Sequence, residues 1–168
     1  NAIIHIKLDT GMGRIGFLPT EKSVQEVVEI SKLPNVTVEG IFTHFSKADE
    51  KDKEYANRQF EIFCEFNDRL SENGLDIKIK HCANSAGIIE LQSQPFNMVR
   101  AGIISYGMWP SDEVNKAAIS LKPILALKSH VVYVKEVEDG TPVSYGSTWV
   151  SEGKRKIATV PIGYGDGY

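Results

Sequence analysis

The chain has 168 residues, of which 42% are hydrophobic and 24% charged, with 19 basic against 22 acidic side chains and a formal net charge of −3. This composition is typical of a globular protein and excludes an intrinsically disordered chain. No cluster of Lys and Arg stands out, and apolar runs stop short of the roughly 18 residues of a membrane-spanning helix, so we expect neither nucleic acid nor a membrane as partner.

The cysteine and histidine residues indicate neither a disulfide scaffold nor a metal centre. Cys64 and Cys82 form no CxxC pair, and two cysteines are too few to staple a small secreted domain. His5, His81 and His130 lack the spacing of a zinc site, both among themselves and with the cysteines. We therefore expect no metal, and a reducing, cytoplasmic setting.

Residues 1–120 alternate between strand and helix patterns. β-Branched residues and alternation predict a strand over 2–8, and a glycine-rich turn follows over 11–16. Helical spacing of apolar residues predicts a helix from 20 or 21 to 33, ended by Pro34, and another over 54–70, capped by Gly74. The other predicted elements are strands over 36–45, 77–83 and 96–101, a polar loop over 46–53 and a short helix over 85–91. Strands alternating with helices form βαβ units around a parallel sheet, which predicts an α/β fold.

The pattern changes in the last third of the chain. Beyond Pro123 no helical period remains, and strand patterns cover 124–137, 143–149 and 156–161. Asp139 and Gly140 form a hairpin-type turn between the first two of these strands. We predict one domain over 1–120 and a second, β-rich domain over 121–168. The four strands of the first domain fit either half of an eight-stranded barrel or a small open sheet.

Polar residues gather at the predicted carboxyl ends of the four strands, where ligand sites lie in both architectures. Basic and imidazole side chains at these ends suit an anion, and a Ser beside a helix start can bind phosphate oxygens. A Gly at a strand end exposes backbone N–H groups to the same anion. The pattern predicts a site for a small phosphate-bearing ligand, built from Lys7, Arg14, His44, Asn84, Ser85, Arg100, Gly102 and Ile103.

At these residues the sequence resembles the alanine racemases, pyridoxal phosphate (PLP) enzymes that interconvert L- and D-alanine for bacterial cell-wall synthesis. The matching segments run in order along the whole chain. They are 5–16 (HIKLDTGMGRIG), 43–45 (THF) with 48–50 (ADE), 81–86 (HCANSA), 97–100 (NMVR) with 102–103 and 106–107, 143–146 (VSYG) and 161–164 (PIGY).

The resemblance implies the second half of a TIM-like (β/α)8 barrel followed by the start of a C-terminal β domain, in a homodimer whose active sites are shared between subunits. Asn84, Ser85, Gly102 and Ile103 would contact PLP, with the last three holding its phosphate. Arg100 would donate to the pyridine nitrogen, and His44 would bind Arg100.

The resemblance also assigns roles in catalysis. Racemisation needs two bases on opposite sides of a planar intermediate, with PLP as the electron sink. Tyr145 of the partner subunit, linked through His44 to Arg100, would be the base acting on L-alanine. Arg14 would contact the PLP phenolic oxygen and the substrate carboxylate, and a carbamylated Lys7 would fix Arg14. Tyr164 would line the access to the site.

One feature of the family pattern is absent from the 168 residues. A motif resembling Lys-Ala-Asn-Ala-Tyr-Gly, which carries the Schiff-base lysine, is not found. We therefore expect an internal fragment of a longer enzyme, inactive by itself. A racemase of the same fold acting on serine, lysine or a broader range of amino acids is one alternative. A non-catalytic PLP-binding barrel protein is another, although the β-rich segment with Tyr145 counts against it.

Overall fold

The computed structural model describes residues 1–91 and 96–167, and the chain divides into two compact units. The first unit is Asn1–Ile124 and the second is Leu125–Tyr168. The sequence predicted a boundary near residue 120. Each unit has its own sheet structure and is described separately below.

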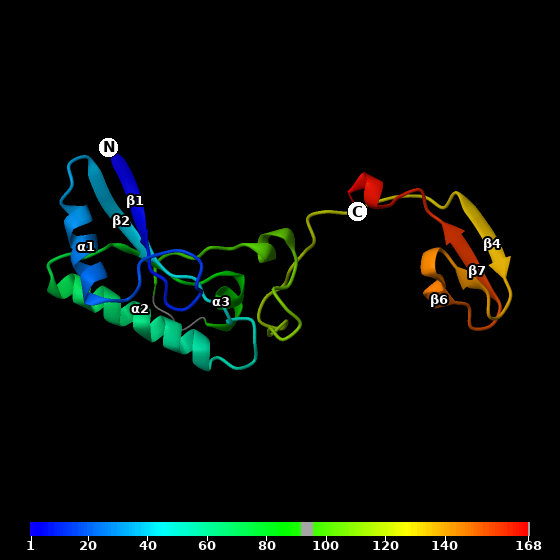
Figure 1. Cartoon of the computed structure of the whole chain (residues 1–168), viewed down its shortest axis with the longest axis horizontal. Coiled ribbons are helices and arrows are strands. Elements are labelled where there is room, and N and C mark those ends of the chain that lie inside the picture. Colours follow the sequence, from blue (N-terminus) through cyan, green and yellow to red (C-terminus); the bar gives the residue numbers. More distant parts are fainter. Residues whose placement is uncertain (92–95, 168) are drawn as a thin grey trace. The chain divides into compact units, whose positions relative to one another are not determined.

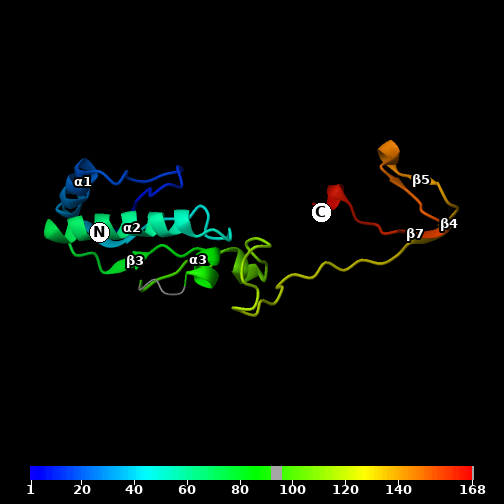
Figure 2. The same cartoon turned by 90° about the horizontal axis from the view of Figure 1, so that it is seen from below.

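A three-stranded parallel sheet forms the centre of the first unit (Figure 1). Its order is β1 (Ala2–Lys7), β2 (Val36–Phe42) and β3 (Ile79–His81), with α1 (Glu21–Ser31) between β1 and β2. Along the chain, the long helix α2 (Glu54–Glu72) follows β2 and precedes β3, and β3 leads into the short α3 (Ser85–Glu90) (Figure 2). The predicted βαβ order and parallel sheet are confirmed.

The two helices begin and end where local chemistry favours it. Thr20 caps α1 by accepting a hydrogen bond from the backbone N–H of Ser23 at 3.2 Å. After α2, Gly74 takes a left-handed φ of +80°, and the Leu75 N–H donates to the Leu70 carbonyl at 2.9 Å. This closure satisfies a carbonyl at the helix end, as expected for a glycine placed there.

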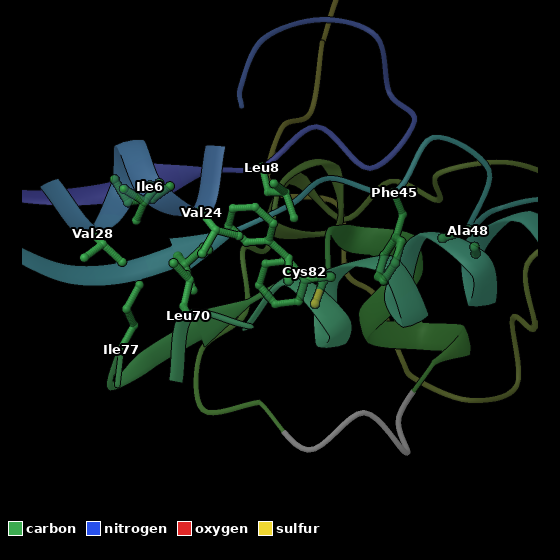
Figure 3. Packing of buried hydrophobic residues seen from close by; sticks show 14 of the residues in the cluster. Ile6, Leu8, Val24, Val28, Phe45, Ala48, Leu70, Ile77 and Cys82 are labelled. Carbon is green, nitrogen blue, oxygen red and sulfur yellow. The ribbon is translucent and has the colours of Figure 1, made fainter. Parts of the chain in front are cut away.

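The two faces of the sheet differ in chemistry, because successive side chains of a strand point to opposite sides. Ile6, Leu8 and Ile41 are buried in a cluster with α1 and α2 (Figure 3). Burial of each such side chain contributes roughly 1.5–3 kcal/mol. The opposite face carries His5 and Lys7 of β1, Phe42 of β2 and His81 of β3.

The predicted strand over 96–101 is wrong, because these residues form no strand in the structure. The Asn97 side chain accepts from the Lys80 N–H at 3.0 Å and donates to the Lys78 carbonyl at 2.8 Å. It thereby occupies two backbone groups, at and just before β3, with which the backbone of a neighbouring strand would pair. A single backbone hydrogen bond, from Arg100 N–H to the Ala83 carbonyl at 3.0 Å, places this segment beside the end of β3.

The second unit contains two antiparallel strand pairs (Figure 1). β4 (Tyr133–Val137) pairs with β7 (Arg155–Thr159), and β5 (Pro142–Val143) pairs with β6 (Trp149–Val150). The β-rich character expected here is confirmed, but the strands over 124–137 and 143–149 are shorter than predicted.

The predicted hairpin at Asp139-Gly140 is also wrong, because β4 pairs with β7 and not with β5. Ser151 explains the difference. Its hydroxyl donates to the Glu138 carbonyl at 2.6 Å and accepts from the Thr141 N–H at 2.9 Å, and its carbonyl accepts from Gly140. The turn is thus bound to the segment after β6, and β4 is left to pair with β7.

Candidate active site

The loop after β1 is held in a fixed shape by the Asp9 carboxylate. Asp9 Oδ1 accepts hydrogen bonds from the Gly11 and Gly13 N–H groups, both at 3.0 Å. Burial raises the pKa of Asp9, but these backbone donors and the charge of Lys7 outweigh it, and the net pKa is lowered. The loop places the exposed Arg14 near the end of β1.

Lys7 points from the end of β1 into a region that already holds positive charge. Its Nζ donates to the Leu8 carbonyl at 2.6 Å and lies 5.7 Å from the centre of the Phe42 ring. Desolvation lowers the pKa of Lys7, Asp9 raises it, and Arg100 and Arg14 lower it further, for a net lowering. At a given pH, Lys7 is therefore a neutral amine for a larger fraction of the time than an exposed lysine is.

Arg100 is the most densely bonded side chain of the site. Its NH1 group donates to His81 Nδ1 at 2.5 Å and to the His81 carbonyl at 3.2 Å. Its NH2 group donates to the Thr43 carbonyl at 2.7 Å and to the Cys82 carbonyl at 3.2 Å, and lies 3.4 Å from His44 Nδ1. Within the described part of the chain, its Nε–H makes no hydrogen bond. One donor of the guanidinium is thus left for a ligand.

Both ring nitrogens of His44 face nitrogen donors. Its Nδ1 lies 3.4 Å from NH2 of Arg100 and its Nε2 lies 3.5 Å from Nδ2 of Asn84, so the neutral ring accepts a hydrogen bond on one side only. Desolvation, with Arg100, Arg14 and Lys7 nearby, lowers the pKa of His44 and favours this neutral form. His44 therefore lies between Arg100 and Asn84, the residue whose side chain accepts from the Gly87 N–H at the start of α3.

The start of α3 provides donors for an anion. Asn84 caps α3, and its side chain accepts from the Gly87 N–H at 3.0 Å. Ser85 is buried, and its Oγ accepts from the Gly102 N–H at 2.9 Å. The Ser85 O–H and the Ile103 N–H are without acceptors among the residues described.

A single cavity of about 370 Å³ brings most of the predicted site residues together. Its volume lies in the roughly 300–1,000 Å³ range of small-molecule sites. Met12, from the loop that carries Arg14, also lines it. The predicted residues that line it are His44, Asn84, Ser85, Arg100, Gly102 and Ile103. Free donors at Ser85 and Ile103 suit a phosphate, and the Nε–H of Arg100 suits a neutral ring-nitrogen acceptor.

Tyr145 and Tyr164 belong to the second unit and are almost fully exposed, at 97% and 95%. Tyr145 begins a 3₁₀ turn, η2 (Tyr145–Ser147), between β5 and β6. Ser144 and Ser147 beside it have left-handed φ values of 64° and 51°, a conformation that strains residues with a side chain by roughly 1–3 kcal/mol each. This strained turn presents the phenol to solvent within its own unit.

Sequence reasoning missed three residues that the structure connects to Arg100. His81 Nε2 lies 2.8 Å from His5 Nδ1, and His5 Nε2 lies 3.2 Å from Glu39 Oε2. The signal in the sequence was the alternation that puts His5 and Lys7 on one strand face, together with the position of His81 at the end of the third strand. Groups of His, Cys, Asp and Glu that could hold a metal ion are not found in the described residues.

Two family models match the chain. Residues 1–110 match "Alanine racemase, N-terminal domain" and residues 124–168 match "Alanine racemase, C-terminal domain". The alanine racemase of Clostridium perfringens strain SM101 is 54% identical over 167 residues, which cover 99% of this chain and 43% of that protein. The alanine racemase of Methanococcus maripaludis is 51% identical over 165 residues, with coverages of 98% and 44%. The chain thus spans less than half the length of these relatives.

Solved structures agree with these matches. The alanine racemase of Clostridium difficile 630 superposes with a TM-score of 0.85 at 50% identity, covering 99% of this chain and 44% of that one. The E. faecalis alanine racemase gives 0.82 at 40% identity, with coverages of 98% and 44%. These neighbours confirm the predicted fold class, part of a TIM-like barrel followed by a C-terminal β domain. With both domain models matched in order, the chain belongs to the alanine racemase family.

Proposed function

We propose that the protein containing this chain is a PLP-dependent racemase that interconverts L- and D-alanine. The observation that carries the proposal is the cavity beside Arg100, where a bound guanidinium retains one free N–H and Ser85 and Ile103 offer free donors. The phosphate and the pyridine nitrogen, at the two ends of PLP, both accept hydrogen bonds from such donors. The family membership agrees with this assignment.

The residues of this chain would hold the cofactor at both ends. Ser85, Gly102 and Ile103 would bind its phosphate, and Asn84 would hold Ser85 at the start of α3. When bound, PLP supplies an electron sink for the bond pair left behind when the α-proton is removed. Arg100 stays charged at physiological pH, so it would donate a hydrogen bond to the ring nitrogen without giving it a proton. This would make the cofactor a weaker electron sink and would suppress side reactions such as transamination.

Tyr145 of the partner subunit would take the α-proton of L-alanine. An unperturbed phenol has a pKa near 10, so a base at neutral pH needs a donor that stabilises its phenolate. His44 would be such a donor through Nε2–H when its Nδ1 accepts from NH2 of Arg100. In a homodimer with shared active sites, the exposed Tyr145 of one subunit would complete the site of the other. A lysine outside these 168 residues would be the base on the opposite face.

Arg14 would bind the substrate carboxylate, and Lys7 would hold Arg14 in place. The neutral Nζ of Lys7 would attack the carbon of CO2, forming an N–C bond and releasing one proton to solvent, which leaves a carbamate anion. The lowered pKa of Lys7, caused first by desolvation, favours the neutral amine that this reaction needs. The carbamate would pair with the Arg14 guanidinium and orient it toward the substrate carboxylate and the PLP phenolic oxygen. Tyr164 would line the access to this site.

The cellular role follows from the product. D-alanine would supply peptidoglycan synthesis, in the cytoplasm where free thiols such as Cys64 and Cys82 persist. Over the described residues, none of the helices combines the length and apolar character required to cross a membrane.

The proposal is tested by an assay of the full-length protein that contains this chain. L-alanine, L-serine and L-lysine are each incubated with it in the presence of PLP, and both enantiomers are measured by chiral chromatography. We expect alanine to approach a 1:1 mixture with the highest kcat/KM of the three. Absence of D-alanine, or a higher kcat/KM for serine or lysine, would refute the assignment.

A further inference from the structure

A line of hydrogen bonds runs across the polar face of the sheet and ends on Arg100. Glu39 Oε2 lies 3.2 Å from His5 Nε2, and His5 Nδ1 lies 2.8 Å from His81 Nε2. His81 Nδ1 lies 2.5 Å from NH1 of Arg100. The line connects all three strands and the segment after α3, and it leads away from the cavity toward the more exposed Glu39.

Only one arrangement of hydrogens satisfies every contact in this line. Arg100 cannot accept a hydrogen bond, so His81 Nδ1 must accept, and the neutral His81 ring carries its hydrogen on Nε2. His81 Nε2–H then donates to His5 Nδ1, which leaves the hydrogen of His5 on Nε2. That hydrogen donates to the Glu39 carboxylate. The direction of the line, from Arg100 to Glu39, is therefore fixed at both ends.

The backbone of β2 makes the space that the line requires. Gly40 lies opposite His5, and a Cβ built on Gly40 would lie only 2.5 Å from His5 Nδ1 and Cε1. Because Gly40 has no side chain, the His5 ring lies over the middle strand and reaches His81 on β3. The pairing also skips Glu39, since Ile4 pairs with Val38 and His5 with Gly40. This bulge brings Glu39 to His5, and bulges commonly re-aim a side chain beside a functional site.

Packing holds His81 in the plane that Arg100 needs. The Phe42 ring stacks on His81 with centroids 4.9 Å apart and an interplanar angle of 2°. The same Phe42 ring lies 5.1 Å from the guanidinium carbon of Arg100. One aromatic ring therefore fixes both partners of the shortest hydrogen bond in the line.

We propose that His81 is a positioning residue for Arg100, and that His5 and Glu39, with the space left by Gly40, hold His81 in the tautomer that accepts from the guanidinium. With NH1 and NH2 both bound, Nε–H is the guanidinium donor left for a ligand, and the group cannot turn about its own axis. The effect of this arrangement on catalysis rests on the proposed PLP chemistry, whereas the tautomer of His81 does not. Desolvation, with Arg100 and His5 nearby, lowers the pKa of His81 to about 4, which agrees with a neutral ring.

The first test measures the tautomer without any reference to activity. The full-length protein is labelled with ¹⁵N in its histidine rings, and the spectrum of His81→Asn assigns the His81 signals. We expect His81 at pH 7 to be neutral with its hydrogen on Nε2. A hydrogen on Nδ1, or a doubly protonated ring, would overturn the proposal, because either form removes the acceptor for Arg100.

The second test follows the effect on the site. His81→Leu is expected to lower kcat by about 10²-fold with little change in KM, since a small displacement of a catalytic group has this size of effect. It should also shift the absorbance maximum of bound PLP, which reports on the hydrogen bond to the ring nitrogen. His81→Asn keeps an oxygen acceptor near the Nδ1 position and should restore most of the loss. His130→Leu, an exposed histidine of the second unit, serves as the matched control.

Gly40→Ala separates positioning from simple loss of structure. The added methyl group displaces the His5 ring while leaving His81 and Arg100 intact, so we expect a partial loss of kcat and a changed His81 tautomer population. Wild-type turnover and absorbance in both His81→Leu and Gly40→Ala would overturn the proposal. If wild type itself forms no D-alanine, the proposed function fails, and the ¹⁵N measurement still decides whether the line of hydrogen bonds exists.

Discussion

Charge and hydrogen-bond direction at single residues explain most of the site. Arg100 donates to His81 and to three backbone carbonyls, and the tautomer of His81 must adapt to that donor. His81 is left with an Nε2–H that points to His5. A single residue that cannot accept a hydrogen bond therefore sets the direction of the hydrogen bonds beyond His81.

Replacement of Tyr145 by Phe in the full-length protein removes the proposed base and nothing else. We expect kcat for L-alanine to fall by about 10²–10⁴-fold, the usual contribution of a general base. The absorbance of bound PLP should stay unchanged, because the phenol does not hold the cofactor. Tyr133→Phe, on the exposed side of β4, is the control and should keep full turnover. Unchanged turnover in Tyr145→Phe would remove this residue from its role.

The stability of the fold should depend on the pH through His81. Desolvation, with Arg100 and His5 nearby, lowers the pKa of His81 from 6.5 to about 4. Between these values the unfolded chain binds a proton that the folded chain excludes, so the free energy of unfolding falls as the pH falls from 6.5 to 4.

Urea denaturation of the full-length protein at pH 7, 5.5 and 4.5 measures this effect. In wild type the unfolding midpoint should drop more steeply with decreasing pH than in His81→Asn. His44 is present in both proteins and cancels in the comparison. Parallel pH profiles of the two proteins would contradict the expected behaviour of His81.

At the scale of elements, α2 fixes the loops that carry the site. Gln59 is buried on this helix, and its Oε1 accepts from the Ser46 N–H at 3.0 Å. Its Nε2 donates to the His44 carbonyl at 3.2 Å and to the Thr10 hydroxyl at 3.3 Å. One helical side chain therefore connects the loop after β1 with the loop after β2, and with it the backbone of His44.

Gln59→Leu should destabilise the protein, because it leaves buried polar groups of these loops without partners. We expect a loss of about 1–3 kcal/mol in the free energy of unfolding, measured by urea denaturation. Gln25→Leu on α1 is a matched control, since Gln25 makes only exposed hydrogen bonds, and its effect should stay within about 0.5 kcal/mol. Equal effects of the two substitutions would show that Gln59 does not organise the loops.

Local pattern predicted the elements of the first unit well and those of the second less well. The stripe at Val24, Val27 and Val28 marks α1 because a buried helix face repeats every 3.6 residues. The strand expected over 96–101 does not form because the Asn97 side chain binds the Lys80 N–H of β3 and the Lys78 carbonyl just before it. Such competition between side chain and backbone depends on which segments meet, and periodicity carries no information about it.

For the whole molecule, the sheet of the first unit has two edges. β1 and β3 each pair with another strand on one side only among the described residues; Phe17 covers the carboxyl end of β1, and Ile3 farther along β1 is 64% exposed. Unpaired edges with apolar side chains bind other strands. The chain spans less than half the length of the alanine racemases that it matches.

The 168-residue chain expressed by itself should therefore associate and should not racemise alanine. We expect species larger than a monomer in sedimentation velocity, because of the sheet edges. With PLP and L-alanine added, D-alanine should stay at the level of a heat-killed control, because no segment resembling the family's lysine motif occurs in these residues. Turnover above that control would contradict this expectation, and a monomeric sedimentation profile would contradict the role of the edges.

The sequence by itself determined the alternation of β1, β2 and β3 with α1, α2 and α3 in the first unit, and several of the residues that line the cavity. Both follow from local rules: apolar periodicity, and the position of polar residues at strand ends. Only the tertiary structure decided that His81, His5 and Glu39 extend from Arg100, and that Gly40 leaves room for a histidine. These features depend on strand register and on contacts between residues 19–76 positions apart, which no local pattern encodes.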